Sequence, residues 1–184
     1  MRRYTIFFSI IAATVTAVFA VRAGYYPLAL VGGDILLARD FRNQYRAART
    51  YYENVRAMYG AASTLPAADM ERAVFTAMIE GALVHAAVRE EIGTETARMV
   101  AARVDAFLED ADLLRAADAA YGVGAGEFRA MVLVPQAERE ILTGQLFLRG
   151  EKFEDWLAKA KRSERVVVLA PGLHWDGAEV QSGR

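Results

Sequence analysis

Two histidines, His85 and His174, are the first side chains to consider for chemistry. His85 falls in the middle of a predicted helix, without the Glu-x-x-His or His-x-x-x-His spacing that places metal ligands on one helical face. A structural histidine that bonds to a neighbour is therefore the favoured interpretation over a metal ligand. His174 follows the predicted strands near the end of the chain, and we interpret it as a solvated residue.

The nucleophiles and acids also lack the patterns that catalysis needs. The chain has no cysteine, which excludes thiol nucleophiles, disulfides and zinc–thiolate sites. No serine lies in the Gly-x-Ser-x-Gly turn of serine hydrolases. The acids at 109–112 are typical of a solvated helix end, and the glycines at 122–126 lack the spacing of a dinucleotide-binding turn. The sequence therefore predicts no catalytic residue, no metal site and no cofactor, which indicates that the protein is not an enzyme.

An aromatic stripe is the strongest candidate for binding. Its members recur at spacings of three and four, so that one helical face would carry Phe41, Tyr45, Ala48, Tyr52, Val55 and Tyr59. Such a stripe commonly belongs to a core, but tyrosine also suits a half-exposed apolar groove, because its hydroxyl reaches water or a peptide group. Whether the stripe is core or groove is left open by the sequence. If it is a groove, its candidate polypeptide-binding residues are Tyr45, Tyr52 and Tyr59, together with Phe75 and Met78 of the next predicted helix.

The charge balance argues against nucleic acid as a partner. The 184 residues carry 22 basic and 23 acidic side chains. Arg2, Arg3 and Arg22 are the basic residues before Gly24, and no acid precedes Asp34. From Gly24 onward the balance is therefore 19 basic against 23 acidic residues, or −4. Phosphate binding needs a basic stripe, which this composition does not favour.

The first 23 residues have the composition of a membrane segment. Tyr4–Val21 is an uncharged run of 18 residues behind Arg2 and Arg3. Its length favours a single-pass membrane anchor over a cleaved signal peptide, whose apolar region is usually shorter, and a buried core helix is the third alternative. Arg2 and Arg3 would stay in the cytoplasm, which places the rest of the chain on the extracytoplasmic side.

The remaining chain predicts one mostly α-helical domain, residues 24–172, followed by a flexible tail at 173–184. The pattern predicts a short hairpin around Gly32-Gly33 and a strand at Arg165–Ala170, which we expect to pair because an isolated hairpin is marginal. The predicted helices between them cover 38–59, 67–92, 95–109, 113–120, 127–148 with a kink or break at Pro135, and a short segment from Phe153. The expected fold is an irregular helical bundle with a small β-hairpin joined by a C-terminal strand, plus the N-terminal transmembrane helix.

Three stretches resemble the N-terminal domain of SurA-like and PrsA-like exported foldases, the parvulin-associated chaperones. They are LALVGGDILLARDFRNQYRAA, ERAVFTAMIEGALVHAAVREEIG and YGVGAGEFRAMVLVPQAEREIL, which occur in the family's order and cover most of Leu28–Leu148. In that family the last strand of the helical domain returns to the first hairpin, and RVVVLA has that place here. Many members insert a parvulin isomerase domain before this strand, but Gly150–Glu164 is far too short for one. The resemblance therefore implies polypeptide binding without isomerase activity.

These observations predict a membrane-tethered, ATP-independent chaperone that binds unfolded or partly folded polypeptides. The alternative is a non-catalytic structural or adaptor subunit of a cell-envelope complex. The sequence leaves the partner and the oligomeric state open.

Overall fold

The structure is a computed structural model that describes residues 21–59, 66–93 and 95–183. The predicted leader at 1–23 lies almost wholly outside these residues, so the membrane anchor stays a prediction. Within the described residues, no helix combines the length and the apolar character that crossing a bilayer requires.

A three-stranded antiparallel sheet joins the two ends of the domain. β1 (Pro27–Val31) and β2 (Asp34–Leu37) form the predicted hairpin, with Gly32 and Gly33 at positive φ in its turn. β3 (Val166–Val168) pairs with the other edge of β1, which gives the strand order β2-β1-β3. The predicted closure by the C-terminal strand is confirmed, and it sets Ala29 opposite Val168.

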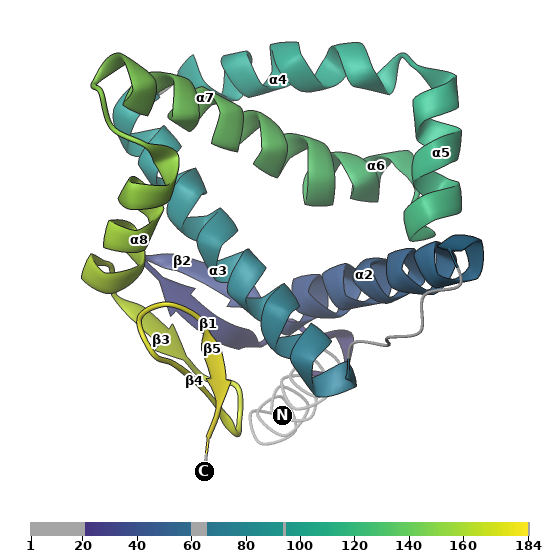
Figure 1. Ribbon diagram of the computed structural model, residues 1–184, viewed down its shortest axis with the longest axis horizontal. Helices are drawn as coiled ribbons and strands as arrows, with labels where there is room; N and C mark the ends of the chain where they lie inside the picture. The colour runs from purple at the N-terminus through teal and green to yellow at the C-terminus, as the bar shows by residue number, and fades with distance from the viewer. Residues whose placement is uncertain (1–20, 60–65, 94, 184) are drawn as a thin grey trace, which may run out of the picture.

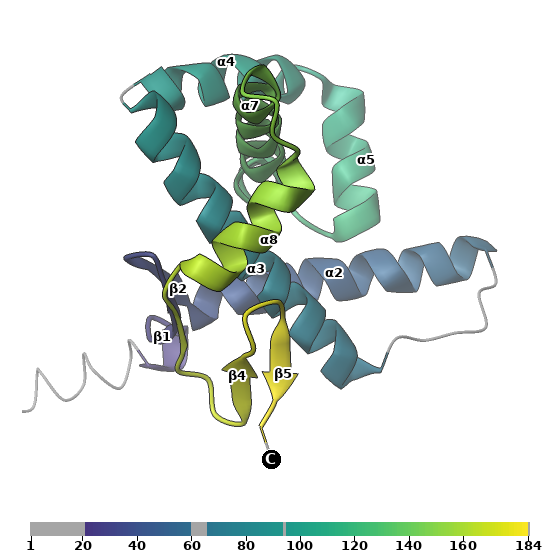
Figure 2. The ribbon, with the colours of Figure 1, turned by 60° about the vertical axis from the view of Figure 1, so that its left-hand side comes forward.

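Helices fill the chain between β2 and β3, which confirms the mostly helical fold class (Figure 1). α2 (Ala38–Tyr59) and α3 (Ala67–Ile92) have the predicted bounds. The others are α4 (Glu95–Leu108), α5 (Ala111–Tyr121), α6 (Ala125–Phe128), the π-helix η1 (Arg129–Leu133), α7 (Val134–Leu148) and α8 (Phe153–Ser163). α2 projects away from the sheet, and its distal half passes beside α5 (Figure 2).

Pro135 explains the π-helical turn between α6 and α7. A proline inside a helix has no N–H to donate, and its ring clashes with the carbonyl of the fourth residue before it. Here the backbone widens just ahead of it, so that the N–H of Val134 donates to the carbonyl of Arg129, five residues back. Pro135 thus lies in the first turn of α7, and the predicted kink or break becomes a local widening of the helix.

Two hydrophobic cores lie on either side of the middle of α3. The sheet core contains the inner face of the sheet, the start of α2, and Phe75 and Ile79 of α3. The helical core contains Val84 and Val88 of α3, packed with side chains from α4 to α8. Full burial of a side chain such as Phe75 or Ile79 stabilises the fold by about 1.5–3 kcal/mol, so each core contributes substantially.

The C-terminal residues form a second hairpin, so the prediction of a flexible tail after residue 172 is wrong for the described part. β4 (Leu173–Trp175) pairs with β5 (Val180–Ser182) in antiparallel register. Val180 is 2% exposed and belongs to the sheet core, which is the physical reason that the segment is held in place. The Asp176-Gly177 step between the strands is the sequence signal for this hairpin, because Asp-Gly is a favoured pair in tight β-turns.

Candidate functional site

Three of the five predicted groove residues lie on α2 and become more exposed along it. Tyr45 is half-buried and stacks on Phe41, with ring centroids 6.0 Å apart. Tyr52 is exposed, and Tyr59 is 78% exposed at the end of the helix. The distal part of α2 therefore presents an apolar surface to solvent, formed by Tyr51, Tyr52, Met58 and Tyr59, which we call the α2 aromatic surface.

The other two predicted groove residues are buried, so the prediction of one groove lined by all five residues is wrong. Phe75 is 1% exposed and packs edge-on against Phe41, with ring centroids 5.6 Å apart. Met78 is 6% exposed. Helical spacing shows that a face is apolar, but it does not show which element covers that face. The stripe is consequently core at its beginning and surface at its end.

α5 and the turn after it hold the α2 aromatic surface in position. The Tyr51 ring stacks on Tyr121 of α5, with centroids 5.1 Å apart and planes 12° from parallel. The side-chain amide of Asn54 donates to the backbone carbonyls of Ala119 and Ala120 at 2.8 and 3.0 Å, which satisfies acceptors in the last turn of α5. These contacts fix the helix on one side, while Tyr52 and Tyr59 stay exposed.

The aromatic side chains alternate with cations on the same helix. Arg46 lies 3.4 Å from Glu127, and the Arg49 guanidinium donates to Glu53 at 2.7 Å. The hydrogen bond and the charge of the Glu53 carboxylate raise the pKa of Arg49 above its ordinary value, so this residue stays cationic. Tyrosine, methionine and arginine are the side chains enriched at polypeptide interfaces, and they occur together here.

His85 has a partner that the sequence did not show. Its Nδ1 lies 2.7 Å from Oε1 of Glu138, which is on α7, 53 positions along the chain. Glu138 is buried, whereas the His85 side chain is 42% exposed. A buried carboxylate needs such a hydrogen bond, so the pair ties α3 to α7 and agrees with the interpretation of His85 as a structural residue. Among the described residues, no three His, Cys, Asp or Glu side chains are placed to hold a metal ion together.

Three hollows among the described residues lie away from the α2 aromatic surface. One of about 320 Å³ lies between α3, α8 and the β1–β2 turn. Another of about 450 Å³ lies between α3 and β5, with mainly polar and charged walls. A third of about 160 Å³ is more apolar and lies between α4 and α7, where Phe107 and Val132 contribute to its wall. None of these three hollows is lined by a residue of the α2 aromatic surface.

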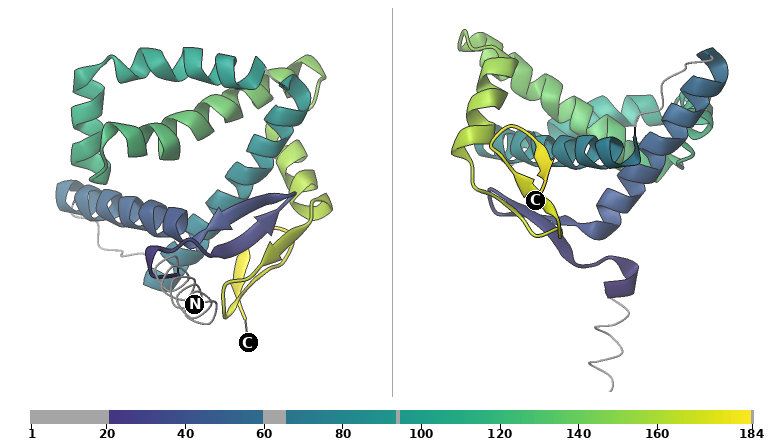
Figure 3. Two further views of the ribbon diagram at one scale, coloured as in Figure 1. Left: turned by 180° about the vertical axis from the view of Figure 1, so that it is seen from behind. Right: turned by 60° about the horizontal axis from the view of Figure 1, so that its bottom comes forward.

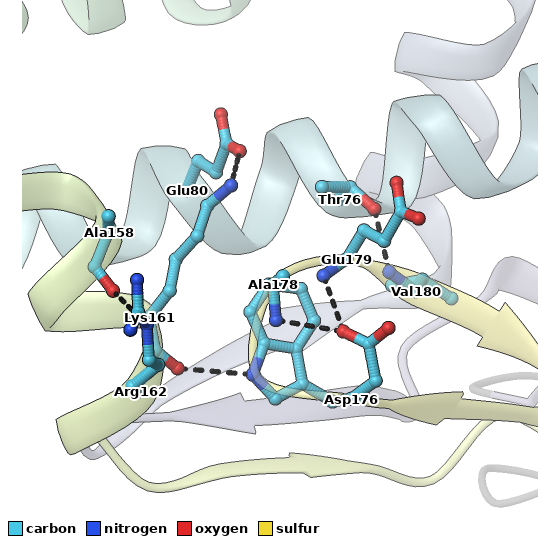
Figure 4. Close-up of polar contacts among 10 residues, drawn as sticks. Thr76, Glu80, Ala158, Lys161, Arg162, Asp176, Ala178, Glu179 and Val180 are labelled. Carbon is cyan, nitrogen blue, oxygen red and sulfur yellow. Dashed lines mark hydrogen bonds and ion pairs between the residues drawn. The ribbon is translucent and has the colours of Figure 1, made fainter. Parts of the chain in front are cut away.

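The C-terminal hairpin is fastened to α3 and α8 by polar contacts (Figure 4). Thr76 Oγ1 on α3 accepts a hydrogen bond from the backbone N–H of Val180 at 2.9 Å. The Trp175 indole N–H donates to the carbonyl of Lys161 at 3.3 Å, and the Lys161 ammonium forms an ion pair with Glu80 of α3. These contacts join three separate parts of the chain, so the hairpin is part of the folded domain.

No known protein family, no curated protein and no solved structure shows a significant similarity to this chain.

Proposed function

We propose that this protein is a membrane-tethered, ATP-independent chaperone on the extracytoplasmic side, and that it binds unfolded or partly folded polypeptides on the α2 aromatic surface. The observation that carries the proposal is the exposure of Tyr52, Met58 and Tyr59 on a helix braced by α5. Soluble proteins seldom leave several large apolar side chains exposed together unless the surface binds something. The tether is supported by the uncharged run Tyr4–Val21 behind two arginines.

The order of the strands and helices along the chain also supports the chaperone proposal. The resemblance to the SurA-like and PrsA-like domain implies a first hairpin that is completed by a strand returning after the helices. The order β2-β1-β3, with helices in the intervening chain, has this arrangement. No catalytic group is required for such a function, because clients would be held through apolar and aromatic contacts alone.

One feature favours the alternative, a structural or adaptor subunit of a cell-envelope complex. The α2 aromatic surface belongs to a single helix that projects from the sheet (Figure 2), and its side chains are exposed. An exposed apolar helix face can lie in a hydrophobic groove of one fixed partner, which is a recurring mode of recognition. The two functions are separated by the range of polypeptides that the protein binds.

Suppression of aggregation by the full chain in lipid nanodiscs tests the proposal. Several chemically denatured proteins with unrelated folds would be diluted into buffer with and without it. We expect suppression for most of them and a several-fold loss in Tyr52→Ser/Tyr59→Ser. Phe147→Ser/Leu148→Ser is the matched control, because Phe147 and Leu148 are each 79% exposed, close to the 78% of Tyr59, but lie at the end of α7.

Two outcomes would contradict the chaperone proposal. If the control variant lost as much activity as the tyrosine variant, the α2 aromatic surface would have no special role. If the unmodified chain suppressed the aggregation of none of these clients, the adaptor alternative would be favoured. Circular dichroism melts of each variant would show that the fold is retained.

A further inference from the structure

The sheet carries apolar residues on both faces, and the described residues cover one face more fully than the other. Ala29, Val31, Leu36, Val166 and Val168 face the sheet core. The residues between them point the other way and form what we call the outer sheet face, which consists of Leu30, Ile35, Leu37, Val167 and Leu169. Ile35 is 57% exposed and Leu169 is 47% exposed. In Figure 3 (left) β1 and β2 lie in front of α3, so this face is turned toward the viewer.

The strand register makes the outer sheet face continuous. Leu30 on the central strand lies opposite Ile35 on β2 and opposite Val167 on β3. Side chains at opposite positions of an antiparallel pair lie about 4.5–5.5 Å apart at Cβ, so the three form one row across the sheet. An antiparallel sheet with one solvated face normally carries polar residues on it, whereas the paired outer positions here are all apolar and the exposed Arg165 lies beyond the end of β3.

The chain just before β1 has the composition of a membrane interface. Tyr25 and Tyr26 are both exposed and directly precede Pro27. The Arg39 guanidinium donates to the Tyr25 hydroxyl at 2.6 Å and lies 5.4 Å from the centre of its ring. Tyrosine and arginine side chains together are typical of the level of lipid headgroups, where the ring meets the apolar boundary and the cation meets phosphate.

Further arginines surround the same segment. Arg22 is exposed within it, and the guanidinium of Arg42 lies so close to Gly24 that a Cβ built there would collide with it. Asp40, in the first turn of α2 beside Arg39, is an exposed acid. Three arginines, Arg22, Arg39 and Arg42, thus lie in or against this segment. The resulting positive charge at this end of the sheet complements anionic lipid headgroups.

We propose that the outer sheet face rests on the surface of the lipid bilayer, with Tyr25, Tyr26 and the arginines at headgroup level. The inference relies on the anchoring by residues 1–23 that belongs to the proposed function. An anchor that ends at residue 23 holds β1 within a few residues of the membrane, so the sheet meets lipid at a high effective concentration. The membrane then covers the apolar face. This contact fixes the orientation of the domain on the membrane, with α2 projecting from the sheet.

Site-specific fluorescence tests this proposal. Because the chain has no native cysteine, a dye can be attached at one introduced cysteine alone. The full chain would carry one cysteine with an environment-sensitive dye at Ile35→Cys, at Leu169→Cys or, as controls, at Phe147→Cys and Tyr59→Cys. Each would be reconstituted in vesicles of equal parts phosphatidylcholine and phosphatidylglycerol that contain a lipid quencher near the headgroup. We expect a blue shift and several-fold stronger quenching at Ile35→Cys and Leu169→Cys than at either control.

Three outcomes would overturn the inference, and they can be distinguished. If the labelled chain does not float with the vesicles, the anchoring proposal fails, and this inference fails with it. If the chain floats but Ile35→Cys is quenched no more than Phe147→Cys, the outer sheet face does not meet lipid, while the anchor stands. If Ile35→Cys shows the same blue shift in detergent without lipid, in a particle of twice the monomer mass, a second copy of the chain covers the face instead.

Discussion

Asp176 shows how one side chain sets the shape of a whole hairpin. Its carboxylate accepts hydrogen bonds from the backbone N–H groups of Glu179 and Ala178, both at 2.8 Å, and so closes the turn between β4 and β5. These two bonds hold the pKa of Asp176 below its ordinary value, because they stabilise the charged form. The hairpin in turn places Val180 in the sheet core.

Acidification is therefore expected to loosen the C-terminal hairpin. Because the folded-state pKa of Asp176 is the lower one, its carboxylate stabilises the fold at every pH above the unfolded value of about 3.9. This stabilisation is lost as the pH falls below that value and through the folded-state pKa. Trp175 fluorescence, followed from neutral pH downward in a Trp156→Phe background, should show an acid transition. Asp176→Ala should abolish this transition, and an unchanged transition in that variant would contradict the assignment.

At the scale of single elements, the ends of helices depend on a few residues with special backbone angles. Gly122 ends α5 in the left-handed conformation, with φ +65°, and its N–H donates to the carbonyl of Asp118. A Cβ at this position would also lie 3.4 Å from the Thr50 methyl group on α2. That distance is an ordinary van der Waals contact, so it is the left-handed backbone that requires glycine here, at the place where the α2 aromatic surface is braced.

Replacing this glycine should destabilise the protein more than replacing its near neighbour. Gly122→Ala is expected to lower the free energy of unfolding by about 1–2 kcal/mol, since an L-residue is disfavoured at positive φ. Gly124 has φ −74°, and a methyl group added there would meet no atom within 4 Å, so Gly124→Ala should lose only the N-cap preference of glycine over alanine and should destabilise less than Gly122→Ala. Urea denaturation of both variants measures the difference in stability. Equal midpoints would show that the left-handed conformation at residue 122 does not disfavour alanine.

Some of these elements and contacts could be predicted from the sequence, and others could not. The bounds of α2 and α3 follow from local signals, namely apolar spacing, Pro66 before α3 and Gly93 after it. The pairing of β1 with β3 was also predictable, because neither part forms a stable sheet alone. The burial of Phe75 and Met78 and the Glu138 partner of His85 were not, because they depend on which distant element packs against α3. The β4–β5 hairpin was missed because its strands have only three residues each.

At the scale of the molecule, α3 connects the sheet core to the helical core. At 1.5 Å per residue its 26 residues extend about 39 Å, so the two cores lie along one rod. The C-terminal hairpin contributes to the sheet core, where Val180 is fully buried. Stability should consequently differ between the two halves of this helix when the hairpin is removed.

Truncation after Pro171 tests this division. Amide hydrogen exchange should accelerate strongly in the half of α3 that contains Phe75 and Ile79, because the core around them loses Val180. The half that contains Val84 and Val88 should change much less. Val180→Ala, which removes two methyl groups from the core, should give the same pattern at smaller magnitude. A uniform acceleration along α3 would show that the two cores unfold as one unit.

The pairing of β1 with β3 also sets an order of events during synthesis. Ala29 leaves the ribosome 139 residues before its partner Val168. At about 5–20 residues per second, the edge of β1 that β3 will occupy waits roughly 7–28 s for its hydrogen-bonding partner. Over that interval the nascent chain carries an open strand edge that other chains can pair with. The protein that we propose binds unfolded chains is thus itself open to unwanted strand pairing until β3 has been synthesised.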